Sequence, residues 1–263
     1  MIQSAIEVTN ESEFIKALIV GDYGTGKSVF ASTFCGKMKA DDAGPADKPE
    51  VIESKGKGFV FDFDKGIRTY RGRNLDYAQY DVSGKGWNDF NKEFMEVEKL
   101  VKEGVYRTVV VDSTSMFADM AMESALLLDP KRSPTGGPLW NVHYGIVKNL
   151  VEGKLRRLLQ WKCNILILAH QQVITDSESG AVIKIQPLLP GALSDKLPGY
   201  FDEVYISQSG MKDGKPDFTL QTLPRGLYKA RSRISGQEQC LPMYIPNTYE
   251  GLMAAIAKGT KKK

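Results

Sequence analysis

The stretch from residue 14 to residue 28, FIKALIVGDYGTGKS, limits the possible folds more than any other part of the chain. Phe14 to Val20 is a largely apolar run that predicts a buried strand, and it stops at the first glycine of a G-x-x-x-x-G-K-[ST] motif. Residues Ser28 to Met38 predict a helix directly afterwards. A strand, this motif and a helix in that order predict a phosphate-binding loop, whereas an ordinary glycine-rich turn with a surface lysine needs neither flanking element.

The motif has a chemical reason for each of its residue types. Glycines let the backbone curl until its N–H groups point inward at a phosphate chain. Lys27 is expected to reach the β- and γ-phosphates of ATP, and the Ser28 hydroxyl is expected to bind Mg²⁺. The predicted nucleotide-binding residues are Gly21, Asp22, Tyr23, Gly24, Thr25, Gly26, Lys27, Ser28 and Val29.

Composition excludes several other classes of protein. The chain has 263 residues, of which 42% are hydrophobic, and a net charge of +3, so any nucleic-acid surface must come from local clustering of cations. Its three cysteines lack C-x-x-C spacing, and two histidines are too few for a histidine-rich metal site. Because no apolar run is long enough to span a bilayer, we expect a cytoplasmic protein without a membrane partner.

Hydrophobic periodicity alternates between strand and helix along most of the chain, which predicts an α/β fold with a mostly parallel, twisted sheet and helices on both faces. Antiparallel strands are expected at the C-terminal end, and residues 129–140 are expected to be irregular. Residues 173–185 are expected to form a hairpin or loop. Three parts are predicted: a lead-in at 1–13 that could contact a neighbouring subunit or be a frayed strand, a domain at 14–257 and a basic tail at 258–263. The expected strands are 14–20, 58–63, 75–82, 108–112, 164–169, 203–208 and 217–223, and the expected helices are 28–38, 87–103, 113–128, 142–161 and 248–257.

Two aspartates at strand ends are candidates for the chemistry. Asp112 follows a continuous apolar strand and is expected to hold Mg²⁺ through water, a role that can coexist with capping the next helix. The residue after it is Ser113, so a carboxylate that activates water must come from another strand. Asp64 is the natural supplier, although a helix cap or an ion pair would also explain it.

In the segments FVFDFDKG and ILILAHQQ the sequence resembles the RecA family, and within it the small phage-encoded RecA-like ATPases that support single-strand annealing and recombination. The resemblance covers most of the chain and implies a RecA-like P-loop NTPase core. Asp64 then stands at the family's catalytic glutamate, and its shorter side chain implies slow hydrolysis. His170 and Gln171 match the γ-phosphate sensor, although a histidine after an apolar strand can also be a hydrogen-bonded core residue.

The same resemblance implies DNA-binding and subunit-bridging residues. Residues 129–140, with Lys131 and Arg132, resemble the family's first DNA-binding loop, and residues 172–190, with Lys184, resemble the second. In the segment RGLYKARSR, Lys229 and Arg231 resemble the paired cations that enter a neighbouring subunit's nucleotide site. Strand alternation would place both on one face. The segment could instead be a solvated basic strand or a DNA-facing patch.

These features together predict an ATP-dependent, single-stranded-DNA-binding recombinase or annealing protein of phage recombination or replication. It is expected to form a homo-oligomer, either a filament or a ring, with ATP at the subunit interfaces and a single-strand-binding protein as a candidate helper. Two other functions stay open from the sequence. One is a nucleotide-switched DNA-binding or loader protein with weak ATPase activity, and the other is a P-loop small-molecule phosphotransferase.

Overall fold

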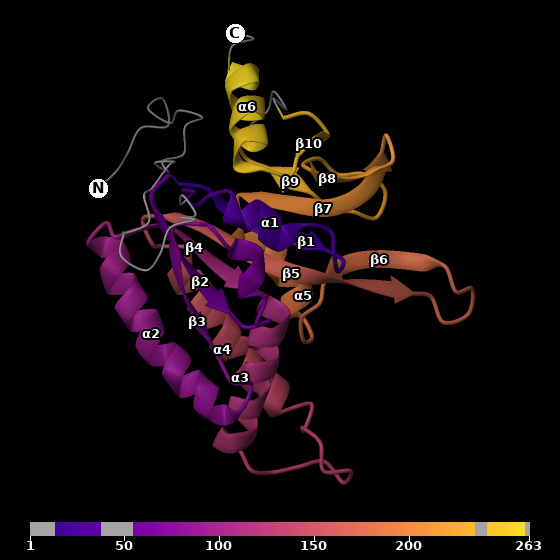
Figure 1. Cartoon of the computed structure of the whole chain (residues 1–263). Coiled ribbons are helices and arrows are strands. Elements are labelled where there is room, and N and C mark those ends of the chain that lie inside the picture. The colour runs from indigo at the N-terminus through magenta and orange to yellow at the C-terminus, as the bar shows by residue number, and fades with distance from the viewer. Residues whose placement is uncertain (1–13, 38–54, 235–240, 261–263) are drawn as a thin grey trace, which may run out of the picture.

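The computed structural model describes residues 14–37, 55–234 and 241–260 (Figure 1). The predicted lead-in at 1–13 and residues 261–263 of the predicted tail lie outside this part of the chain.

A ten-stranded sheet runs through the described part of the molecule (Figure 1), with strand order β10-β8-β7-β1-β5-β4-β2-β3. Strand β6 pairs with β5, and β9 pairs with β7. The strands are β1 (Lys16–Gly21), β2 (Lys57–Asp62), β3 (Leu75–Gln79), β4 (Tyr106–Asp112), β5 (Asn164–Thr175), β6 (Val182–Pro187), β7 (Glu203–Lys212), β8 (Lys215–Gln221), β9 (Arg231–Ser232) and β10 (Tyr244–Pro246).

The strands that carry the predicted site are parallel. β1 pairs in parallel with both β5 and β7, β4 pairs in parallel with β5 and β2, and β2 pairs in parallel with β3. β8, β9 and β10 join as antiparallel strands at the C-terminal end of the chain. This arrangement confirms the predicted α/β, RecA-like P-loop NTPase fold. Because the carboxyl ends of parallel strands meet at one edge, the residues after β1, β2, β4 and β5 are brought together there.

Helices cover both faces of the sheet, as predicted (Figure 1). Leu18 and Val20 of β1 face the larger core, which includes residues of α2, α3 and α4, whereas Ala17 and Ile19 face the core that includes residues of α1 and α6. The period-two alternation of the buried strands therefore supplies apolar side chains to two cores at once. The helices are α1 (Lys27–Ser32), α2 (Gly84–Lys102), α3 (Thr114–Leu128), α4 (His143–Leu158), α5 (Leu193–Lys196) and α6 (Tyr249–Thr260), with short 3₁₀ helices η2 (Ile67–Tyr70) and η3 (Leu197–Tyr200).

Four helix boundaries differ from the predictions by three residues or more, and two of them are the start of α2 at Gly84 and the end of α4 at Leu158. Helix α1 ends at Ser32, where Ser32 Oγ and Thr33 Oγ1 donate to the carbonyls of Val29 and Phe30 and so compete with continued helix hydrogen bonding. Helix α6 continues to Thr260, three residues beyond its predicted end at 257.

Residues 173–185, for which the sequence predicts a hairpin or a loop, belong to a hairpin. β5 continues beyond the sheet edge to Thr175, and its last five residues pair with β6 to form an arm that extends away from the body (Figure 1). Asp176 shapes the turn by accepting hydrogen bonds from the backbone N–H and the hydroxyl of Ser179.

None of the helices within the described ranges has the length and apolar character that crossing a bilayer requires.

Candidate active site

The loop between β1 and α1 has the conformation that its glycines predict. Gly24 and Gly26 have φ angles of 69° and 89°, in the left-handed region that favours glycine. A Cβ atom on Gly26 would lie 2.6 Å from Asn247 Nδ2, so the position has no room for a side chain. The predicted residues from Gly21 to Val29 thus form one continuous cradle of backbone.

Lys27 lies inside this cradle, with 6% of its surface exposed. Its amino group donates to the carbonyls of Gly21 and Asp22 at 3.0 and 2.8 Å. Burial lowers the pKa of Lys27, whereas the negative charges of Asp112 and Asp64 act in the opposite direction. A buried ammonium group held only by carbonyls fits an anion, because a phosphate oxygen is a stronger acceptor for it.

Asp112 ends β4 and meets the start of α1. Its carboxylate is 3% exposed and accepts hydrogen bonds from Ser28 and from the Tyr70 hydroxyl, the latter at 2.8 Å. Burial raises the pKa of Asp112 to about 6, although both hydrogen bonds lower it. Mg²⁺ binds oxygen ligands, and here a hydroxyl oxygen and a carboxylate lie in contact. Ser28 and Asp112 are therefore the residues that would hold Mg²⁺.

Asp64, just after β2, is bound by Ser113, which directly follows β4, and by His170 of β5. Ser113 donates to Asp64 Oδ1 from its hydroxyl at 2.8 Å and from its backbone N–H at 3.2 Å. His170 Nε2 lies 3.1 Å from Asp64 Oδ2 and must carry the proton, because a carboxylate only accepts. Burial acts to raise the pKa of Asp64, but the hydrogen bonds from His170 and Ser113 outweigh it, so the pKa lies below its ordinary value.

A hollow of about 280 Å³ joins these groups. It is bordered by the loop from Tyr23 to Val29 and by Asp64, Asp112, His170 and Phe218. The Tyr23 ring packs on His170 with the ring centres 4.5 Å apart. The structure therefore brings the predicted loop, metal and water-activating residues to one place. Gln171, the neighbour of His170 in β5, instead pairs with Pro187 at the base of the arm.

The predicted cation pair is arranged differently from the expectation. Strand β9 begins at Arg231, so the prediction that Lys229 and Arg231 share one strand is wrong. Arg231 donates from one guanidinium nitrogen to the carbonyls of Pro198 and Phe201, which follow helix α5, whereas Lys229 is exposed. Both residues still border one small hollow of about 270 Å³.

Two of the three predicted DNA-binding cations are engaged within the chain. Arg132 donates to the carbonyls of Leu126, Asp129 and Lys131 and thereby caps the end of α3. Lys184 on the arm forms an ion pair with Asp195. Lys131 is exposed, and its side chain forms no ion pair with the residues that the structure describes.

The comparison with known families decides the class of this chain. A family model described as an AAA domain matches residues 13–234. The chain belongs to this family. It therefore carries an AAA-type P-loop ATPase domain, in agreement with the geometry of the loop.

Comparison with individual proteins adds little to the family assignment. No match was found among the curated proteins. The crystal structure of a KaiC-like protein from the hyperthermophilic archaeon Pyrococcus horikoshii OT3 is 14% identical in sequence; the alignment covers 88% of this chain and 84% of that one, with a TM-score of 0.42. Similarity this low says nothing about the substrate or assembly of the AAA domain.

Several residues of the AAA domain's site carry no recognisable signal in the sequence. Tyr70 binds Asp112, and Asn247 Nδ2 donates to the Gly26 carbonyl at 2.9 Å from 221 residues away. Ser207 Oγ donates to the Thr25 carbonyl at 2.7 Å, and Phe218 packs beside Gly26. Strands β7 and β8 and the residue after β10 thus support the phosphate loop from outside.

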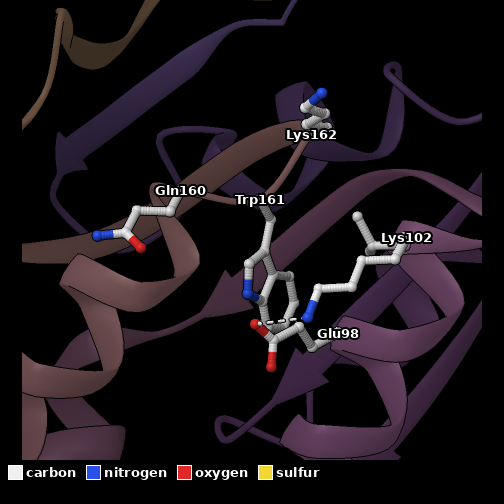
Figure 2. Close-up of a pocket in the computed structure, with 6 residues that line it drawn as sticks. Glu98, Lys102, Gln160, Trp161 and Lys162 are labelled. Atoms are coloured by element: carbon white, nitrogen blue, oxygen red, sulfur yellow. Dashed lines mark ion pairs between the residues drawn. The ribbon is translucent and has the colours of Figure 1, made fainter. Parts of the chain in front are cut away.

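A second hollow in the AAA domain, of about 520 Å³, lies where α2 ends and the chain enters β5. Figure 2 shows Glu98 and Lys102 meeting beside the Trp161 indole, whereas Gln160 and Lys162 point away. Glu98 is also bound by Arg157, so its charge is already neutralised. Although this hollow is larger, it has no glycine loop and no cluster of metal-binding oxygen atoms, so the chemistry points to the smaller one.

Proposed function

We propose that this AAA domain hydrolyses ATP as part of a single-stranded-DNA-binding recombinase or annealing protein. The observation that carries the proposal is the meeting of Lys27, the Ser28–Asp112 pair and Asp64 in one hollow. They come from the ends of three strands, β1, β4 and β2, that the parallel sheet aligns. A phosphate cradle, two oxygen ligands and a separate charged carboxylate are the parts that phosphoryl transfer to water requires.

Each group has a distinct task in this proposal. Lys27 and the loop N–H groups bind the β- and γ-phosphates, and Ser28 and Asp112 hold Mg²⁺, which supplies neutralisation of phosphate charge when bound. Asp64 accepts a hydrogen bond from the attacking water and orients it. Its lowered pKa keeps it ionised at neutral pH, and the hydrogen bonds from Ser113 and His170 fix its direction. His170, with Tyr23 against its ring, is the γ-phosphate sensor.

The hollow contains fewer cations than phosphoryl transfer usually uses. Among the described residues that border it, Lys27 is the single Lys or Arg. Additional positive charge on the γ-phosphate typically raises hydrolysis by about a thousandfold or more. We therefore propose that Lys229 and Arg231 of a neighbouring copy complete the site in a filament or ring. Exposed Lys229 is the better placed of the two, since Arg231 already binds carbonyls of its own chain.

A slower, switch-like use of ATP is the second candidate. Asp64 is one methylene shorter than glutamate, and both of its carboxylate oxygens are already hydrogen-bonded. These bonds leave fewer lone pairs for water and favour a protein that changes DNA affinity with bound nucleotide and turns over slowly.

ATP hydrolysis with and without single-stranded DNA tests the proposal. We expect stimulation by DNA in the native protein and loss of activity in Lys27→Ala and in Lys229→Ala. Mixing these two inactive variants should restore part of the activity, because one contributes an intact phosphate loop and the other an intact cation. Lys229 is exposed, so its loss should leave folding unchanged. Hydrolysis that ignores DNA, or full activity in Lys229→Ala, would contradict the shared, DNA-stimulated site.

A further inference from the structure

We propose that the connection between β2 and β3 binds the phosphate backbone of a single-stranded nucleic acid through Lys65, Arg68 and Arg71. We call these three residues the basic connection. The proposal rests on the proposed function for its nucleic-acid partner, but it assigns the contact to a segment other than the two loops suggested by sequence resemblance. The segment KGIRTYR, residues 65–71, contains three cations and no acidic residue.

The local helix separates an inner face from an outer face. Residues Ile67–Tyr70 form the 3₁₀ helix η2, in which residues three apart lie on the same side. Ile67 and Tyr70 both pack into the smaller core, and Tyr70 is 2% exposed. Arg68 and Arg71 have the same spacing one position later, so they lie together on the side of η2 that is open to solvent.

Nearby acidic groups are turned away from this surface. Asp62 accepts hydrogen bonds from the backbone N–H groups of Gly66 and Ile67 and from Gln79, and it is fully buried. Asp64 is bound by His170 and Ser113. Asp62 is thus committed to the interior, and Asp64 borders the nucleotide hollow with both of its carboxylate oxygens already hydrogen-bonded.

The side chains of the basic connection have no partner among the described residues, unlike two of the cations predicted to bind DNA. Lys65, Arg68 and Arg71 are exposed, and within the described parts of the chain their side chains make no hydrogen bond or ion pair. Arg132 and Lys184, by contrast, are held by backbone carbonyls and by Asp195. A cation without a partner in its own chain keeps its full charge for a phosphate, and binding does not first require breaking an existing contact.

The position of the basic connection also links it to the nucleotide. Thr69, between the two arginines, borders the nucleotide hollow, and Tyr70 binds the metal aspartate Asp112. A strand of nucleic acid on the outer face would therefore contact residues directly adjacent to groups that hold Mg²⁺ on the inner face. This arrangement offers a short path by which DNA could stimulate hydrolysis.

The test compares two double variants that remove the same charge. Arg68→Gln with Arg71→Gln alters the basic connection. Lys99→Gln with Lys162→Gln removes two exposed cations near the amino ends of the parallel strands, of which Lys99 pairs with Glu103 at 3.8 Å. Fluorescence anisotropy of a labelled oligothymidine measures affinity across a range of salt concentrations. Each lost phosphate contact should reduce the salt slope by about 0.7, so the first pair should lose about 1.4 and bind about 25-fold more weakly at 0.1 M salt. The control pair should match the native protein.

Nucleotide binding, measured with a fluorescent ATP analogue, separates the two possible sources of phosphate. Unchanged ATP affinity together with weakened oligothymidine binding supports the proposal. Equal loss of both ligands would show that the arginines serve the nucleotide, and a salt slope equal to that of the control pair would show that they serve neither; both results overturn it. If the native protein binds no oligothymidine while Lys27→Ala still abolishes hydrolysis, the DNA partner and this proposal fail together, and the ATPase assignment stands.

Discussion

Replacing Tyr70 by phenylalanine removes one oxygen atom from the core and, with it, one hydrogen bond to Asp112. The Tyr70 hydroxyl lies 2.8 Å from Asp112 Oδ2, and both side chains are at most 3% exposed. Burial has already raised the pKa of Asp112 to about 6, and the hydrogen bonds from Ser28 and Tyr70 limit that rise. Without Tyr70, the ionised form of Asp112 loses one of its two stabilising donors.

The size of the effect follows from the energy of such a bond. A hydrogen bond to a charged group contributes about 1.5 to 3 kcal/mol, and a shift of one pKa unit corresponds to about 1.4 kcal/mol. The pKa of Asp112 in Tyr70→Phe should therefore rise from about 6 to about 7 or 8. Mg²⁺ needs the ionised carboxylate, so hydrolysis at neutral pH should fall by up to about tenfold and recover as the pH is raised by about two units.

The assay is the pH profile of Mg²⁺-dependent ATP hydrolysis, with Tyr80→Phe as the matched control. Tyr80 is also a buried tyrosine whose hydroxyl binds a carboxylate, Glu93, at 2.6 Å, but neither residue borders the nucleotide hollow. A profile that moves to higher pH only in Tyr70→Phe is the expected result. Equal profiles in the two variants, or an equal loss of activity at every pH, would refute the reasoning that Tyr70 acts through the charge of Asp112.

Two further substitutions have effects that the structure specifies. The pKa of Asp112 is raised from 3.8 to about 6 in the folded chain, so the free energy of unfolding should fall as the pH rises from about 4 to about 6. Asp112→Asn should remove this pH dependence and raise the free energy of unfolding at neutral pH by up to about 3 kcal/mol. The same substitution should abolish Mg²⁺-dependent hydrolysis. Urea unfolding across pH checks the change in stability, and a variant less stable than the native protein at neutral pH would contradict it. Gly26→Ala should lower stability by about 1 kcal/mol or more and weaken nucleotide binding, because its φ of 89° is unfavourable for alanine and its Cβ would meet Asn247 at 2.6 Å. Gly104→Ala, with φ of 78° and nothing within 4 Å of its Cβ, controls for backbone strain alone, and equal losses in the two variants would exclude a role for the Asn247 contact.

Much of the fold and of the candidate site follows from local patterns in the sequence. The phosphate loop, the buried strands β1, β2, β4 and β5 and the strand-end position of Asp112 can all be read from residue spacing, because each depends on neighbours within a few positions. The hairpin arm follows from the same kind of signal. Placing Asp64 opposite Asp112 required one further step, namely the rule that parallel strands align their carboxyl ends at one edge.

Only the tertiary structure decided which side chains are free and which are already bound. Tyr70 reaches Asp112 across 42 residues and Asn247 reaches Gly26 across 221, and neither contact depends on local propensity. The sheet order brings these segments together, and packing then selects individual atoms. For the same reason, cations that look alike in the sequence differ in the fold: Arg132 caps a helix end, whereas Arg68 remains open to solvent. Charge is a property of the residue, but its availability depends on contacts made by distant parts of the chain.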